Sequence, residues 1–162
     1  MFDQLLSGVK DQAIGMLTEK TGLNADQAAG AFPLAGDAVK DGIMGAVTGG
    51  NVGGITDMLS AAVGGGGDGL LNNMIFKGIA GDFITKATSS LGIGQGLAQS
   101  AAAGLIPMLL SKIGGAAKSA GDTDAIDASS IMSVFGAGGG LADKAKDMLG
   151  GAAGGMLGKL MG

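Results

Sequence analysis

Apolar residues recur three or four positions apart along most of this chain, which is the spacing of helices that bury one face. Between residues 2 and 20 the apolar stripe lies opposite a run of charged and polar positions. Other stretches with helical spacing cover residues 34–48, 55–63, 70–90, 128–135 and 141–161. The pattern predicts an all-α protein.

Glycine, asparagine and proline divide this pattern into elements. Thr21 and Gly22 end the first helix. The side chain of Asn24 is placed to cap the next helix, and Gln27 completes a capping box. We expect Pro33 to restart the chain as the first-turn residue of a helix that continues to about residue 48.

A stretch near the N-terminus is repeated 70 residues later. The matching pairs are Gly8 and Gly78, Val9 and Ile79, Ile14 and Ile84, Thr18 and Thr88, Gly22 and Gly92, and Leu23 and Ile93. The next proline follows 11 residues after Gly22 but 15 residues after Gly92, so we expect the register to slip by about one helical turn. The repeat predicts two related units, each with a helix, a glycine turn, a capped helix and a helix restarted by proline.

The repeat and the glycine runs give the predicted organisation of the chain. Residues 1–63 form the first helical unit and residues 70–120 the second. Residues 64–69 form a glycine linker between the two units. The alternative, a phosphate-binding loop, is not favoured because its full sequence pattern is absent. Residues 121–162 form C-terminal helices that pack on the bundle or between subunits. The expected fold is a small Gly/Ala-rich helical bundle of two related units with a C-terminal amphipathic helix.

Composition restricts how the helices can pack and what they can bind. The chain has 35 glycines among 162 residues and only five aromatic residues, all Phe, so we expect close backbone approach, with ten Met as adaptable filler. The absence of Cys excludes disulfides and thiolate metal sites. The net charge is −4 and there is no Arg, so we expect no nucleic-acid binding.

Most catalytic constellations cannot be built from this chain, because it lacks His, Cys, Arg, Tyr and Trp and has Glu19 as its single glutamate. Ser7 and Lys10 have the spacing of a Ser-Lys nucleophile pair, but the companion motifs are missing. Asp37 and Asp41 lie one turn apart and are expected to form a solvated face. We therefore expect no catalytic residue, no cofactor and no enzymatic activity.

Three acidic residues late in the chain have a spacing that faintly resembles a calcium-binding loop. They are Asp122, Asp124 and Asp127, but the third acid is one residue late and the glycine of the sharp turn is missing. A helix cap explains the segment better. We expect Asp127 to cap a helix over residues 128–135, with Ile126 and Ile131 as a hydrophobic staple, and we expect no metal site.

An uncharged run of 25 residues lies between Lys86 and Lys112, which is longer than the roughly 20 residues needed to span a bilayer. Ser, Thr and Gln side chains dilute this run, and Gly92, Gly94 and Gly96 break it. We therefore expect residues 87–111 to form a buried hairpin of core helices, with membrane insertion as the alternative.

The last predicted helix carries a long apolar stripe. Glycines at every fourth position, Gly150, Gly154 and Gly158, would let another helix approach closely. The stripe is the candidate oligomer interface, and it includes Leu141, Met148, Leu149, Ala152, Met156, Leu157 and Leu160.

Several segments together resemble a known family. They are MFDQLL at the start, TGLNADQAAGAF, LGIGQGLAQSAAAGLIPMLLSKI and IDASSIMSVFGAGGGL, with glycine runs between them. Over nearly its whole length the chain is similar to the bacterial YidB-like family of unknown function, particularly to members from Bacteroidota. The resemblance implies a small all-helical bacterial protein and supplies no catalytic residue.

The apolar, small-residue helix faces exceed what one small core must bury, at a mean hydropathy of +0.43. The sequence therefore predicts a non-enzymatic structural protein that associates with itself into a homo-oligomer or filament. We expect it to be cytoplasmic, because its N-terminus lacks the basic start and apolar core of a signal peptide. The alternative is a membrane-surface or membrane-inserting helical protein, although the last helix has only three lysines to attract anionic lipid.

Overall fold

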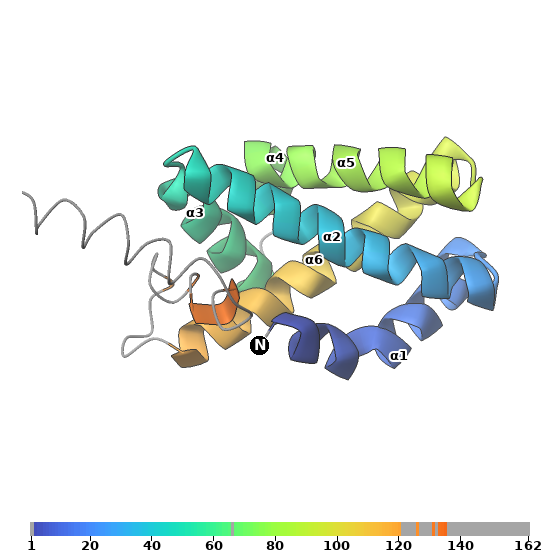
Figure 1. Ribbon diagram of the computed structural model, residues 1–162, viewed down its shortest axis with the longest axis horizontal. Helices are drawn as coiled ribbons and strands as arrows, with labels where there is room; N and C mark the ends of the chain where they lie inside the picture. The colour runs from blue at the N-terminus through green and yellow to red at the C-terminus, as the bar shows by residue number, and fades with distance from the viewer. Residues whose placement is uncertain (1, 66, 121–125, 127–130, 132, 136–162) are drawn as a thin grey trace, which may run out of the picture.

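The structure, a computed structural model, describes residues 2–65, 67–120, 126, 131 and 133–135, and this part of the chain is all-α with no strand, as the sequence predicts. Its helices are α1 (Phe2–Thr21), α2 (Ala25–Thr48), α3 (Val52–Val63), α4 (Gly67–Asn72), α5 (Met74–Leu91) and α6 (Gln95–Ala120). α2 and α6 lie in the middle of the bundle, and α1 and α5 each pack against both of them (Figure 1). α3 packs mainly on α6.

The predicted turn and cap after α1 are confirmed. Gly22 has a φ of +74°, a left-handed conformation that favours glycine, and Gly92 has a φ of +63° at the same place after α5. The backbone N–H of Gln27 donates to Asn24 Oδ1 at 2.8 Å, and the N–H of Asn24 donates to Gln27 Oε1 at 3.2 Å. These two bonds form the capping box that begins α2.

The predicted helix restarts at proline are wrong. α2 runs unbroken through Pro33, and α6 runs unbroken through Pro107. A proline inside a helix removes one backbone hydrogen bond and strains the preceding turn. Pro33 is exposed and lies opposite buried residues on both sides of it, Ala31, Phe32 and Ala35, so burial of the inner face keeps the helix continuous.

The predicted slip in register between the two units is also wrong, because the offset of 70 continues along the second helix of each unit. In the first helices Val9, Ala13 and Leu17 are buried, as are Ile79, Phe83 and Ala87. Seven buried positions in α2 match seven in α6 at the same offset: Ala28, Ala31, Phe32, Ala35, Gly36, Val39 and Ile43, with Ala98, Ala101, Ala102, Leu105, Ile106, Leu109 and Ile113. The two units therefore share one pattern of burial from the first helix to the end of the second.

The two units pack on each other in a reciprocal way. α1 contacts α2 of its own unit and α6 of the other, while α5 contacts α6 of its own unit and α2 of the other. α2 and α6 also touch each other. This arrangement is approximately twofold, so a residue in one unit has an equivalent 70 positions away in the other.

The joint between the units differs from the prediction. The predicted helix over 70–90 is two helices, because α4 ends at Asn72 and Asn73 caps α5. Asn73 Oδ1 accepts the N–H groups of Ile75 and Phe76 at 2.9 and 3.2 Å, and Asn73 Nδ2 donates to the Gly54 carbonyl of α3 at 3.0 Å. Within the predicted glycine linker, residues 67–69 already belong to α4.

Glycines allow the helices to approach closely, as the composition predicts. A Cβ at Gly42 of α2 would overlap Ile79 Cγ1 of α5. A Cβ at Gly114 of α6 would lie 2.7 Å from Val63 Cγ2 and 3.1 Å from the Leu59 carbonyl oxygen of α3. All of these contacts would be closer than ordinary van der Waals contact. Gly42 and Gly114 therefore accept only glycine unless the neighbouring helix moves.

The last described residues complete the core near the N-terminus. Ile126 and Ile131, the predicted staple residues, are both buried, as is Val134. The ring of Phe135 packs 4.9 Å, centroid to centroid, from the ring of Phe2 at the start of α1. Asp122, Asp124 and Asp127, and the predicted C-terminal interface from Leu141 to Leu160, lie outside the described residues.

Candidate functional site

The residues weighed as catalytic form no reactive group in the structure. Ser7 and Lys10 are both exposed on α1, and the Ser7 hydroxyl donates to the Asp3 carbonyl of its own helix at 2.9 Å. Among the described residues no cluster of three or more His, Cys, Asp or Glu could hold a metal ion. The features described below are surfaces of the bundle.

One side of the bundle carries a charged group between α2 and α5. Lys86 Nζ lies 2.8 Å from Asp82 Oδ2 on its own helix and 3.0 Å from Asp41 Oδ2 on α2. The hydrogen bonds that Lys86 Nζ donates to Asp82 and, second in effect, to Asp41 raise the pKa of Lys86 above its ordinary value of 10.5. Asp41, predicted to belong to a solvated face with Asp37, thus pairs with the other unit while keeping 69% of its side chain exposed.

We expect Lys86→Met to lower the free energy of unfolding by about 0.5–1 kcal/mol at pH 7, because all three charges are partly solvated. The folded-state pKa is raised, so this stabilisation is complete below about pH 10.5 and is lost as the pH rises through the folded-state value. Urea unfolding at pH 7 and at high pH should show the difference from wild type shrinking. Lys77→Met, at an exposed position on the same helix, is the control. A difference that does not change with pH would contradict the assignment.

The twofold-equivalent side, between α1 and α6, lacks this charged group. The positions of Lys86, Asp82 and Asp41 are taken there by uncharged residues, Met16, Gln12 and Ser111. Gly42, which lets α2 and α5 approach closely, is replaced by Lys112. In the described part of the chain no hydrogen bond or ion pair links α1 to another helix, whereas α5 has the bonds of Lys86 and Asn73 to its neighbours.

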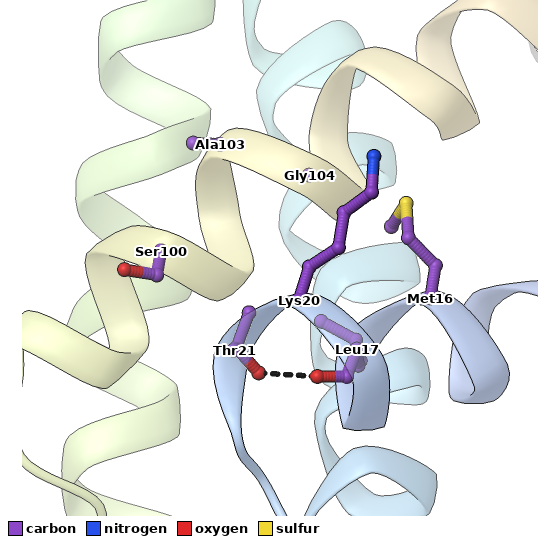
Figure 2. A pocket seen from close by; sticks show the side chains of 7 residues that line it. All are labelled: Met16, Leu17, Lys20, Thr21, Ser100, Ala103 and Gly104. Carbon is purple, nitrogen blue, oxygen red and sulfur yellow. Dashed lines mark hydrogen bonds between the residues drawn. The ribbon is translucent and has the colours of Figure 1, made fainter.

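A hollow of about 260 Å³ opens between α1 and α6 (Figure 2). Met16 and Lys20 extend from α1 toward α6 beside Gly104, and Met16 Cε lies 3.1 Å from where a Cβ of Gly104 would stand. The hydrogen bond drawn there, from Thr21 Oγ1 to the Leu17 carbonyl at 2.6 Å, stays within α1. The remaining lining residues are Ser100 and Ala103.

Comparison with the other unit explains the hollow. On the α2–α5 side, Leu91 fills the equivalent space, since its Cδ2 lies only 2.7 Å from where a Cβ of Gly30 would stand. The equivalent pair on the α1–α6 side is Thr21 and Ser100. Threonine is shorter than leucine, so the space is left open.

A second hollow, of about 320 Å³, lies on the other flank of α6 against α3 and α4. It is mostly apolar, and Leu71 at its edge is 55% exposed. Ala103 lines both hollows and stands between them. We name the outward side of α6 the α6 face; it consists of the uncharged residues Leu97, Ser100, Ala103, Gly104 and Pro107, each of which lies within one helical turn of the next along the helix.

The uncharged run over 87–111 does not form one continuous span, because α5 ends at Leu91 and α6 begins at Gln95. Residues Gln95–Ser119 of α6 are long and apolar enough to cross a membrane, but half of the most apolar window is buried inside the bundle. The core helix of a soluble protein passes the same test of length and composition. The expected burial of this segment is confirmed for its inward-facing residues.

No family model matches the chain, and neither the curated proteins nor the solved structures contain a match. The resemblance to the YidB-like family therefore stays a prediction. The α6 face was not found from the sequence, because its residues are small and unremarkable until they are compared with their equivalents in the other unit. The spacing of Asp82 and Lys86, four residues apart, was the one visible signal of the charged side.

Proposed function

We propose that this protein is a non-enzymatic structural protein that associates with copies of itself, and that the α6 face is a contact between copies. The observation that carries the proposal is the asymmetry between two otherwise equivalent sides of the bundle. The α2–α5 side keeps Asp41, Asp82 and Lys86 in water, while the α1–α6 side has uncharged residues in their places.

Burial of the two sides would have very different costs. Burial of Asp41, Asp82 and Lys86 would remove three charged side chains from water. The loss of their hydration is unfavourable unless the contact supplies new polar partners. The α6 face contains no charge, and its polar Ser100 hydroxyl already donates to the Gly96 carbonyl at 3.0 Å. Lys20, at the edge of the hollow, can keep its ammonium group in water while its stem lies against apolar surface. Burial between copies would therefore cost less at the α6 face than at the Asp41, Asp82 and Lys86 group.

The shape of the α6 face also suits a helix from another copy. Ala103 and Gly104 are small and lie between two hollows, so a neighbouring helix could approach the backbone and place larger side chains on either flank. Leu71 and Leu97, which are 55% and 40% exposed, would add apolar area to the contact.

Ala103→Glu tests the proposal. Ala103 is exposed, so the substitution leaves the core intact but puts a charge at the centre of the proposed contact. We expect association to weaken by roughly tenfold or more, equivalent to about 1.4 kcal/mol. Light scattering over a concentration series measures the change. Ser90→Glu, which adds the same charge at an exposed position of α5, should associate like wild type. Equal association of both variants would contradict the α6 face as the contact.

The C-terminal stripe from Leu141 to Leu160 stays the second predicted contact between copies. A chain that ends at residue 140 should keep the described bundle, because all of its buried core residues are retained. We expect this chain to associate less than the full one, as measured by light scattering with helicity followed by circular dichroism. An unchanged mass would count against a role for the stripe.

A membrane-surface protein is the second candidate, since α6 has the length and apolarity of a spanning helix. The α6 face would then meet lipid instead of protein. Flotation with liposomes separates the two candidates. We expect the protein to stay in the soluble fraction, whereas flotation that Ala103→Glu abolishes would favour the membrane.

A further inference from the structure

Residues 142–162 are identical to residues 2–22 at six of 21 positions, at twice the offset that relates the two units. The tripeptide Gly15-Met16-Leu17 of α1 returns as Gly155-Met156-Leu157, 140 residues later. The other identical pairs at this offset are Asp3 and Asp143, Ala13 and Ala153, and Gly22 and Gly162. We call residues 142–162 the third copy, because their sequence is similar to that of the first helix.

The third copy also matches the pattern of burial seen in α1. The buried positions Val9, Ala13 and Leu17 correspond to apolar residues, Leu149, Ala153 and Leu157. Four of its five charged residues correspond to exposed positions of α1, namely Asp143, Lys144, Asp147 and Lys159 to residues 3, 4, 7 and 19. Placed where α1 lies, the segment would bury apolar side chains and leave most of its charges in water.

The fold brings this segment to the start of α1. Phe135, the last described residue, packs on Phe2, and six residues separate it from residue 142, the equivalent of Phe2. Six residues reach at most about 20 Å when extended, which is ample for a start beside Phe2. We propose that the place of α1 on α2 and α6 is also a binding site for residues 142–162 of the same chain, which compete with α1 for it.

The structure shows why α1 can be replaced there. In the described part of the chain its contacts with other helices are apolar and include no hydrogen bond or ion pair. α5 could not be exchanged in the same way without breaking the bonds of Lys86 to Asp41 and of Asn73 to Gly54.

The hollow beside α1 favours the third copy. Lys20 and Thr21, which line it, correspond to Leu160 and Met161. Leu91, the equivalent of Thr21, fills this space in the other unit, and Met161, which is longer than Thr21 and apolar, would fill the hollow likewise. When residues 142–162 occupy this place, α1 is released from α2 and α6. The proposal concerns a contact within one chain and does not depend on association between copies.

Cysteine cross-linking of the full chain tests the competition, and the natural chain has no Cys to interfere. Met16 Cε lies 3.1 Å from a Cβ position at Gly104, so Met16→Cys with Gly104→Cys and a short bismaleimide calibrates the α1 state. In Met156→Cys with Gly104→Cys, Met156 should take the place of Met16 and give a link within one chain. Met148→Cys with Gly104→Cys is the control, because Met148 corresponds to the exposed Gly8.

We expect the Met156 pair to link at least roughly tenfold more than the Met148 control. Leu157→Asp added to the Met156 pair should abolish its link. The same substitution added to the Met16 pair should make that pair link more completely, because the competitor is weakened. Equal linking of the Met156 and Met148 pairs would overturn the proposal. A link that forms only between a chain carrying Met156→Cys and a separate chain carrying Gly104→Cys would also overturn it, since the occupant would then be a second copy.

Discussion

Gly42→Ala should lower the free energy of unfolding by about 2–3 kcal/mol, a large effect for the addition of one methyl group. The added Cβ would overlap Ile79 Cγ1, and Ile79 is itself 1% exposed in the core. Ile79 cannot turn away freely, so α2 and α5 must separate and weaken the packing around them. Urea unfolding followed by circular dichroism measures the loss.

Gly81→Ala is the matched control for this prediction. Gly81 lies within α5, close in sequence to Ile79, but nothing stands within 4 Å of its Cβ position. Alanine has the higher helix propensity, so this variant should be more stable than wild type by up to about 1 kcal/mol. Equal stability of the two variants would show that α2 and α5 are not in close contact at Gly42.

Phe83→Ala should have the largest effect, about 3–5 kcal/mol, because Phe83 is the largest fully buried side chain among the residues that the structure describes. Its equivalent in α1 is Ala13, which is also fully buried. The substitution removes the burial of the ring and leaves a cavity, and both effects lower stability. The measurement is again urea unfolding.

Phe83→Leu keeps most of the buried volume and should cost about 1–1.5 kcal/mol. Helix propensity cannot explain a larger loss of stability for Phe83→Ala than for Phe83→Leu, because Ala favours the helix more than Leu or Phe. The difference between the two losses therefore reports the loss of packing. A loss below about 1 kcal/mol for Phe83→Ala would contradict the burial of this ring.

Local signals in the sequence predicted the helices well. Apolar spacing located α1 and most of α2, and Asn24 and Gln27 identified a cap that the structure confirms. The prolines misled the prediction because their local preference was weighed without the burial of the opposite helix face. Because the prolines were used to align α2 with α6, the repeat in these helices was missed. Their buried positions are 70 residues apart, whereas Pro33 and Pro107 are not.

Little of the candidate surface could be predicted, because it depends on which helices meet. The spacing of Asp82 and Lys86 was visible, but the contact of Lys86 with Asp41, 45 residues away, needs the packing of α2 on α5. The hollow of Figure 2 depends on a difference between two equivalent places, Thr21 in one and Leu91 in the other. Such a difference acquires meaning only when the twofold arrangement of the units is known.

The central claim, that copies of this protein associate, is tested most directly by its native mass in detergent-free buffer. Size-exclusion chromatography with light scattering should give a multiple of the chain mass of 15.5 kDa that rises or persists with concentration. A mass of 15.5 kDa at every concentration would contradict the claim.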